Sequence, residues 1–266
     1  MIHMNHSKMV FQILTCSLIL FHTGACSRTM PERQTEAQMN RPLVMEALAA
    51  PDTDTVLPDP HKYPVQALVD APLILQFPEF LNGCEVTSLA MLFSFLDLPY
   101  SKEELAVLLP KDPAEPIFDE EGAILSWGDP DLGFVGDMVG ERIGYSVNNG
   151  PLAQLLDRVY EPGSLNLTGE RFEEVERAVA DGRPVIIWTT EDFQPTEQWV
   201  SWVTSSGKEV KATFQEHAVL LVGYDEEYVY INNPLNGQKA EQVAKAPFVE
   251  AWKQLGQQAL TVKRFE

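Results

Sequence analysis

Residues 82–96 read NGCEVTSLAMLFSFL, and this segment decides the fold. Asn-Gly at its start is a turn signal. The apolar residues that follow are near helical spacing, at Val86, Leu89, Ala90, Phe93 and Leu96. The segment therefore predicts a largely apolar helix that begins at Cys84. A cysteine in this position gains from the helix dipole and from unpaired backbone N–H groups, both of which favour a thiolate.

The elements around this helix predict the fold class. Upstream, residues 72–76 form a short apolar strand or extended segment, and residues 77–83 form a loop. Downstream, Ser101 and Glu104 form a capping box that opens a second helix through residue 109, and the glycine-rich residues 110–150 are irregular. Further elements are predicted as helices at 151–160, 170–180 and 246–255, and as strands at 184–190, 218–224, 228–232 and 259–265. Helices come first and strands late, which predicts an α+β fold with a mainly antiparallel sheet.

The composition excludes several classes of protein. The 266 residues carry 19 Lys plus Arg against 39 Asp plus Glu, a formal net charge of −20. We expect no nucleic-acid partner, because such binding needs clustered cations. Three cysteines are too few for a disulfide scaffold. Neither a metal-ligand motif nor a phosphate-cradling glycine loop with its lysine is present, so we expect no metal and no cofactor.

The N-terminus has the pattern of an export signal. Lys8 precedes an apolar run at residues 9–21. This run is shorter than the roughly 20 residues that a membrane-spanning helix needs, but it suits the core of a signal peptide. We therefore interpret residues 1–26 as a signal peptide and expect an exported protein that faces the cell surface or the periplasm.

The end of the signal resembles a bacterial lipobox. Gly-Ala immediately precedes Cys26, the residue that would be acylated and become the mature N-terminus. The usual Leu three residues before the cysteine is Thr23 here, so plain secretion after a simple cut remains an alternative. Residues 27–70 are rich in proline and predict a flexible tether. The folded domain is then expected at 71–266, attached to the membrane through a lipid on Cys26.

Few reactive residues remain once the signal and the tether are set aside: one cysteine, Cys84, and one histidine, His217. A Cys–His pair needs a third group on the second imidazole nitrogen to fix its tautomer and orientation. Asn233 follows the strand predicted to pair with that of His217, so it is suitably placed across the hairpin. Gln76, across a loop from Cys84, is placed to supply an oxyanion donor beside the Cys84 backbone N–H. Each residue alone has an ordinary structural interpretation, whereas the four together indicate a catalytic site.

Four segments carry a specific resemblance. They are residues 76–91 (QFPEFLNGCEVTSLAM), 184–188 (PVIIW), 216–224 (EHAVLLVGY) and 229–235 (VYINNPL). In their order and spacing they are similar to the family-39 cysteine peptidases of the papain clan, in particular to the stand-alone bacterial branch of the Peptidase_C39_2 type. The similarity covers most of residues 70–265. It implies a papain-like fold in which the nucleophile helix packs on the sheet.

The resemblance also implies roles for four residues. Cys84 is the nucleophile, His217 the general base, Gln76 the oxyanion donor and Asn233 the group that orients the imidazole. The family more often has Asp before this proline, and Asn accepts the same hydrogen bond without adding a negative charge. Glu85 is interpreted as a first-turn acid of the helix, with a substrate contact as the alternative.

The expected activity is hydrolysis of a peptide or protein substrate by a monomer. Two other hypotheses stay open: a catalytically silent papain-like surface module that binds peptides or cell-wall fragments, and acyl transfer to an amine in place of water. Three tryptophans have two interpretations each, as cleft-lining or as core residues: Trp188, Trp199 and Trp202.

Overall fold

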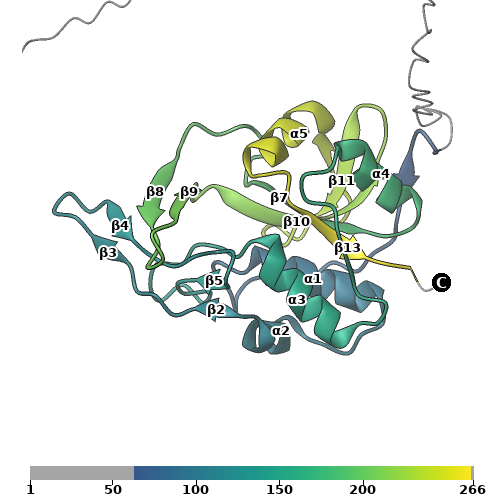
Figure 1. The fold of residues 1–266 in the computed structure, drawn as a ribbon. Coiled ribbons are helices and arrows are strands. Elements are labelled where there is room, and N and C mark those ends of the chain that lie inside the picture. The colour runs from purple at the N-terminus through teal and green to yellow at the C-terminus, as the bar shows by residue number, and fades with distance from the viewer. Residues whose placement is uncertain (1–62, 265–266) are drawn as a thin grey trace, which may run out of the picture. The chain divides into compact units, whose positions relative to one another are not determined.

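The computed structural model describes residues 63–264, and a seven-stranded sheet lies at their centre (Figure 1). All pairings within this sheet are antiparallel. Its main path runs in the order β12 (Glu241–Ala244), β11 (Tyr228–Asn232), β10 (Glu216–Tyr224), β7 (Val185–Thr190), β13 (Ala259–Val262) and β6 (Ser164–Asn166), with β1 (Ala67–Leu68) paired to β10. The predicted α+β class with a mainly antiparallel sheet is confirmed.

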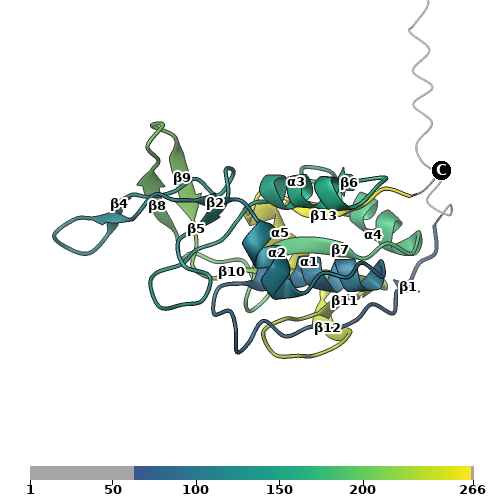
Figure 2. The same ribbon diagram turned by 90° about the horizontal axis from the view of Figure 1, so that it is seen from below.

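Helices cover both faces of the sheet. One face carries α1 (Cys84–Phe95), α2 (Lys102–Leu108) and α3 (Asn149–Val159), and the other carries α4 (Phe172–Ala180) and α5 (Lys245–Gln254), as Figures 1 and 2 show. Successive side chains of a strand point to opposite faces. On β7, Ile186 and Trp188 accordingly pack in the core under α1, whereas Val185 and Ile187 pack in the core under α4 and α5.

Helix α1 is buried on all sides. Every residue from Cys84 to Phe93 is buried, including Thr87 and Ser88, and Ser88 Oγ donates a hydrogen bond of 3.2 Å to the carbonyl oxygen of Ala218 on β10. A helix that is apolar all round is typical of the interior of a domain. The helix predicted from residue 84 is confirmed, and it packs directly on the strand that carries His217.

Two smaller sheets include strands from the segment predicted to be irregular, residues 110–150. β2 (Lys111–Asp112) pairs in parallel with β5 (Phe134–Val135). A four-stranded sheet extends away from the central one (Figure 2) and consists of β3 (Ile117–Phe118), β4 (Ile124–Ser126), β8 (Val200–Val203) and β9 (Glu209–Ala212). The prediction of an irregular 110–150 segment was therefore incomplete. Strands of two to four residues are too short to show a period in the sequence.

The folded domain begins before the predicted boundary at residue 71. Ala67 and Leu68 pair with β10, and the Tyr224 hydroxyl donates a hydrogen bond of 2.7 Å to the Pro64 carbonyl oxygen. The last residues of the expected tether thus belong to the fold. Residues 1–62 lie outside the described part of the chain, and with them the predicted signal peptide, Cys26 and most of the tether. Within residues 63–264, each helix is too short or too polar to cross a bilayer.

Candidate active site

Cys84 is held at the start of α1 by a tight loop. Gly83 precedes it as the helix N-cap, and a Cβ atom on Gly83 would lie 2.5 Å from Phe80 Cβ. Only glycine fits this approach, because real Cβ atoms are not found so close to another carbon. The Cys84 side chain is buried, with 7% of its surface exposed. Its backbone N–H is one of the first-turn donors that have no partner within the helix.

His217 and Asn233 meet across the β10–β11 hairpin. His217 Nε2 lies 3.0 Å from Asn233 Oδ1. The Asn233 amide cannot be reversed, because its Nδ2 donates to Glu241 Oε2 at 2.8 Å and its Oδ1 accepts from the Leu235 backbone N–H at 3.1 Å. The neutral imidazole must therefore carry its proton on Nε2. This tautomer leaves Nδ1 as the basic nitrogen.

Gln76 lies in a segment without secondary structure, and a hydrogen bond ties its backbone to the residue after Asn233. Its N–H donates to the Pro234 carbonyl oxygen at 2.9 Å, and its side chain is 1% exposed. Gln76 Nε2 donates to the Leu81 carbonyl oxygen at 2.8 Å, which leaves the second N–H of the amide for another acceptor. Residues 72–76, predicted to be a short apolar strand or extended segment, do not form a strand in the structure.

One small pocket brings three of the four predicted residues together. Gln76, Cys84 and His217 all line a cavity of about 60 Å³, and Tyr145 and Glu216 form another part of its wall. Asn233 contacts His217 and is buried outside this lining. A second pocket of about 430 Å³ shares Tyr145 and Glu216 with the first and is lined by Trp199 on another side. Trp188 and Trp202 are fully buried, so the core interpretation holds for them.

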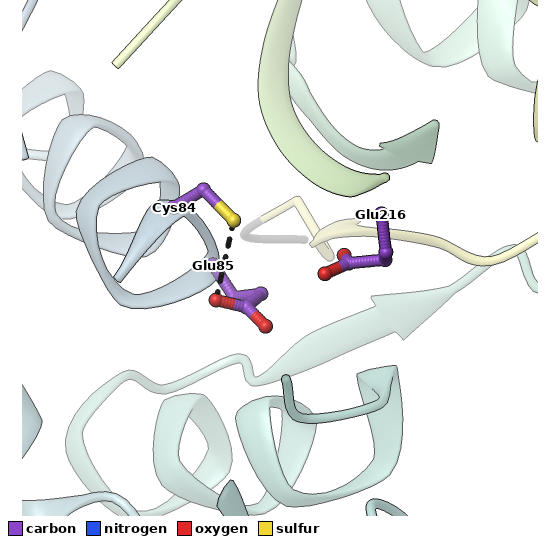
Figure 3. Close-up of side chains that lie close together, drawn as sticks. All are labelled: Cys84, Glu85 and Glu216. Carbon is purple, nitrogen blue, oxygen red and sulfur yellow. Dashed lines mark hydrogen bonds between the residues drawn. The ribbon is translucent and has the colours of Figure 1, made fainter. Parts of the chain in front are cut away.

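Two glutamates surround the thiol (Figure 3). The thiol of Cys84 donates to Glu85 Oε2 at 3.4 Å, and among residues 63–264 no hydrogen bond joins it to His217. Glu85 Oε1 accepts from the Val147 backbone N–H at 2.9 Å. A carboxylate oxygen of Glu216 completes a group of three ligand-type atoms that lie within 4.8 Å of one another. Glu216 escaped the sequence analysis, although it directly precedes the predicted base.

Burial and negative charge keep the nucleophile protonated. Burial raises the pKa of the Cys84 thiol well above its ordinary value, and Glu85 and Glu216 raise it further. Burial also raises the pKa of both carboxyl groups. The helix N-terminus favours the thiolate, but burial and the two glutamates act in the opposite direction, and the net effect is a raised pKa of the thiol. The expected preference for thiolate at the helix start is thus outweighed.

The three atoms of Cys84, Glu85 and Glu216 are of types that zinc accepts, a sulfur and two carboxylate oxygens. The Cys84 thiol donates a hydrogen bond to Glu85, and a metal ion would take up the thiol of the predicted nucleophile. We therefore assign no metal to this group.

The buried imidazole is expected to titrate far below the usual range. Burial lowers the pKa of His217 to about 4, and the hydrogen bond to Asn233 opposes this shift. His217 should therefore stay neutral from pH 7 down to about pH 5, and it should gain its proton only around pH 4. An NMR titration of the histidine ring protons of the full chain measures this, with His217→Gln to assign the resonance. Titration of that resonance between pH 6 and 7 would contradict the burial argument.

Comparisons with known proteins agree with this geometry. The family model described as "Peptidase_C39 like family" matches residues 68–260. The uncharacterized protein YvpB of Bacillus subtilis strain 168 is 35% identical over 187 residues, which cover 70% of this chain and 71% of that protein. A crystal structure from Bacillus anthracis, described as that of a "putative C39-like peptidase", aligns with a TM-score of 0.67 and 37% identity, over 76% of this chain and 99% of the other. The chain therefore belongs to the Peptidase_C39-like family, with an α+β papain-like fold.

Proposed function

We propose that the protein is a cysteine peptidase that hydrolyses peptide bonds with Cys84 as nucleophile, His217 as general base and Asn233 as the residue that orients the imidazole. The observation that carries the proposal is the hydrogen bond between His217 Nε2 and Asn233 Oδ1. Two further hydrogen bonds of Asn233 fix the orientation of its amide, so that Oδ1 accepts and His217 Nε2 donates. His217 Nδ1 is thereby the basic nitrogen of a residue that lines the same pocket as Cys84.

The proposed reaction passes through an acyl-enzyme. His217 Nδ1 takes the proton of the Cys84 thiol as the sulfur attacks the peptide carbonyl carbon. The Cys84 N–H and the second N–H of Gln76 hold the oxyanion. The C–N bond then breaks, and the leaving amine takes the proton from His217. Water, deprotonated by His217, attacks the thioester and releases the acid product with the thiol restored.

The Cys84 thiol and the His217 imidazole are both expected to be neutral before substrate binds. Transfer of the thiol proton to His217 therefore has to begin when the substrate binds. The thiol donates a hydrogen bond to Glu85, and burial lowers the pKa of the imidazole to about 4. The thiol therefore has to turn from Glu85 to His217 when a carbonyl group enters. Apo active sites often show long or misaligned catalytic hydrogen bonds, which tighten in the complex.

Cleavage of a peptide library by the full chain tests the proposal. We expect mass spectrometry to find new termini with the parent protein and none with Cys84→Ala. An epoxide inhibitor of papain-type enzymes should label Cys84, and in His217→Ala the labelling should slow by at least about tenfold. Products that also form with Cys84→Ala, or a parent that is not labelled, would refute the assignment.

One observation favours a second function, a catalytically silent module that holds a peptide in this pocket. The Cys84 thiol donates its hydrogen bond to the carboxylate of Glu85 and not to the predicted base, His217. Equal peptide affinity of the parent and Cys84→Ser, with no product released by the parent, would establish this function in place of the first.

We also propose that the domain works outside the cytoplasm, attached through an acylated Cys26, as a monomer. The proposal rests on the apolar run at residues 9–21 and the small residues before Cys26. Mass spectrometry of the N-terminal peptide from membranes of a bacterial host tests it: a diacylated Cys26 is expected. A free Cys26 in the secreted fraction would instead indicate plain secretion.

A further inference from the structure

Carboxylates dominate the surroundings of the nucleophile. Glu191 and Glu216 line the small pocket beside Cys84, and Glu85 lies against the thiol. Among the residues described as lining this pocket, none is a lysine or an arginine. The carboxyl groups of Glu85 and Glu216 thus have no cationic partner among these lining residues, and ionising them there without one is costly.

Two buried acceptors in this pocket also lack a donor. Glu216 Oε1 and Gln76 Oε1 are both shielded from solvent, and within residues 63–264 neither has a hydrogen-bond partner. Gln76 is 99% buried, since only 1% of its surface is exposed. Its amide cannot be reversed, because its nitrogen donates to the Leu81 carbonyl oxygen. An amide oxygen and a carboxylate oxygen both accept hydrogen bonds, so a ligand that satisfies these two atoms has to supply hydrogen-bond donors.

We propose that this pocket binds a protonated amine of the peptide substrate, with Glu216 as the residue that selects it. The inference rests on the proposed peptidase function and adds a substrate class: peptides with a lysine side chain or another primary ammonium group next to the bond that is cleaved. A cavity of about 60 Å³ has room for an ammonium head group but not for a large side chain. Such a group has three N–H donors, and two of them could bond the unpartnered Glu216 Oε1 and Gln76 Oε1.

Glu216 is placed to join this site to the larger pocket. Together with Tyr145 it lines both the small pocket and the neighbouring cavity of about 430 Å³. A substrate side chain can therefore lie in the larger pocket and bring its ammonium group to Glu216. The net charge of −20 also attracts cationic peptides from a distance, which adds to the preference proposed for Glu216.

The same contact would activate the nucleophile. Glu85 and Glu216 both raise the pKa of the Cys84 thiol, so an ammonium group placed between them opposes that effect. It also competes with the thiol for Glu85, which frees the thiol to turn toward His217. A cationic substrate would thus be bound and would also help to form the thiolate, whereas a neutral isostere would do neither.

Charged thiol reagents test the site without requiring catalysis. The Cys84 thiolate attacks the sulfenyl sulfur of a methanethiosulfonate, a disulfide forms and methanesulfinate leaves. The probes are the 2-aminoethyl reagent, a cation, and the 2-sulfonatoethyl reagent, an anion. Rates at Cys84 in the full chain are resolved from those at Cys16 and Cys26 by peptide mass spectrometry. We expect the cation-to-anion rate ratio to exceed that of free cysteine by at least about tenfold.

Glu216→Gln is the matched variant, since it keeps the shape and removes the charge. It should lower the ratio at least about fivefold, whereas Glu227→Gln, at an exposed position before β11, should leave it unchanged. Taking the ratio cancels any change in thiol pKa, which affects both reagents alike. A parent ratio equal to that of free cysteine overturns the inference, whether or not the variant folds.

Cleavage of matched peptides separates this inference from the proposed function. The matched peptides carry lysine, norleucine or glutamate beside the scissile bond and are otherwise identical. We expect kcat/KM to be highest for lysine, lower for norleucine and lowest for glutamate. Glu216→Gln should remove this preference. Cleavage without a preference for lysine would overturn the cationic subsite and leave the peptidase standing. A raised reagent ratio without any cleavage would keep the acidic subsite and refute the peptidase.

Discussion

Replacing His217 by alanine is expected to lower kcat/KM for peptide cleavage by at least about 1000-fold. The reason is the state of the thiol. Burial and the neighbouring glutamates raise its pKa well above the ordinary value, so very little thiolate exists at pH 7 without a base. Activity of the full chain is measured on one peptide from the library, over a pH series. In the variant the remaining rate should rise with pH as thiolate forms, whereas a rate within about tenfold of the parent would show that another group takes the proton.

Substitutions of Asn233 provide the graded control for this experiment. Asn233→Asp keeps the acceptor for His217 Nε2, so kcat/KM should stay within about tenfold of the parent, although the variant loses the hydrogen bond that Nδ2 donates to Glu241. Asn233→Ala removes the acceptor and leaves the imidazole free to rotate, so we expect a loss of about 10–100-fold. Asn233 also forms hydrogen bonds with Glu241 and Leu235. Thermal unfolding of each variant therefore shows whether activity is lost at the site alone or because the fold is destabilised.

The long elements of the fold could be predicted from the sequence because their patterns are local. The capping box at Ser101 and Glu104 is present as expected, with both of its hydrogen bonds. β7 is buried along its whole length, as its β-branched residues predict. The short strands β6 and β12 were missed, because three or four residues carry no period and their partners are distant in the sequence.

The sequence could identify two residues of the candidate site because their residue types are rare in the folded domain. Cys84 and His217 were found because no other cysteine or histidine remains in residues 71–266. Glutamate is common, so Glu216 carried no such signal. Its proximity to Glu85 depends on how α1 and β10 pack, which the sequence does not show. The available clue was that a glutamate stands directly beside each of the two predicted catalytic residues.

Trp188→Ala should be the most destabilising single change near this site. Trp188 is fully buried in the core between α1 and the sheet, and its Nε1 donates to the Val147 carbonyl oxygen at 3.0 Å. Removing a buried aromatic side chain costs about 3–5 kcal/mol from the transfer and the cavity that remains. Urea unfolding of the full chain, followed by far-UV circular dichroism, measures the loss in the free energy of unfolding. A loss below about 1 kcal/mol would mean that the core closes around the gap.

Trp188→Phe separates the packing of this residue from its hydrogen bond. The phenyl ring keeps much of the apolar volume but leaves the Val147 carbonyl without its donor, so we expect a smaller loss of about 1–3 kcal/mol. Val147 also holds Glu85 through its N–H, and this link joins the core to the nucleophile. If the link matters, Trp188→Phe changes the labelling rate of Cys84 although the side chain lies outside the pocket. An unchanged rate would show that Glu85 keeps its place by packing alone.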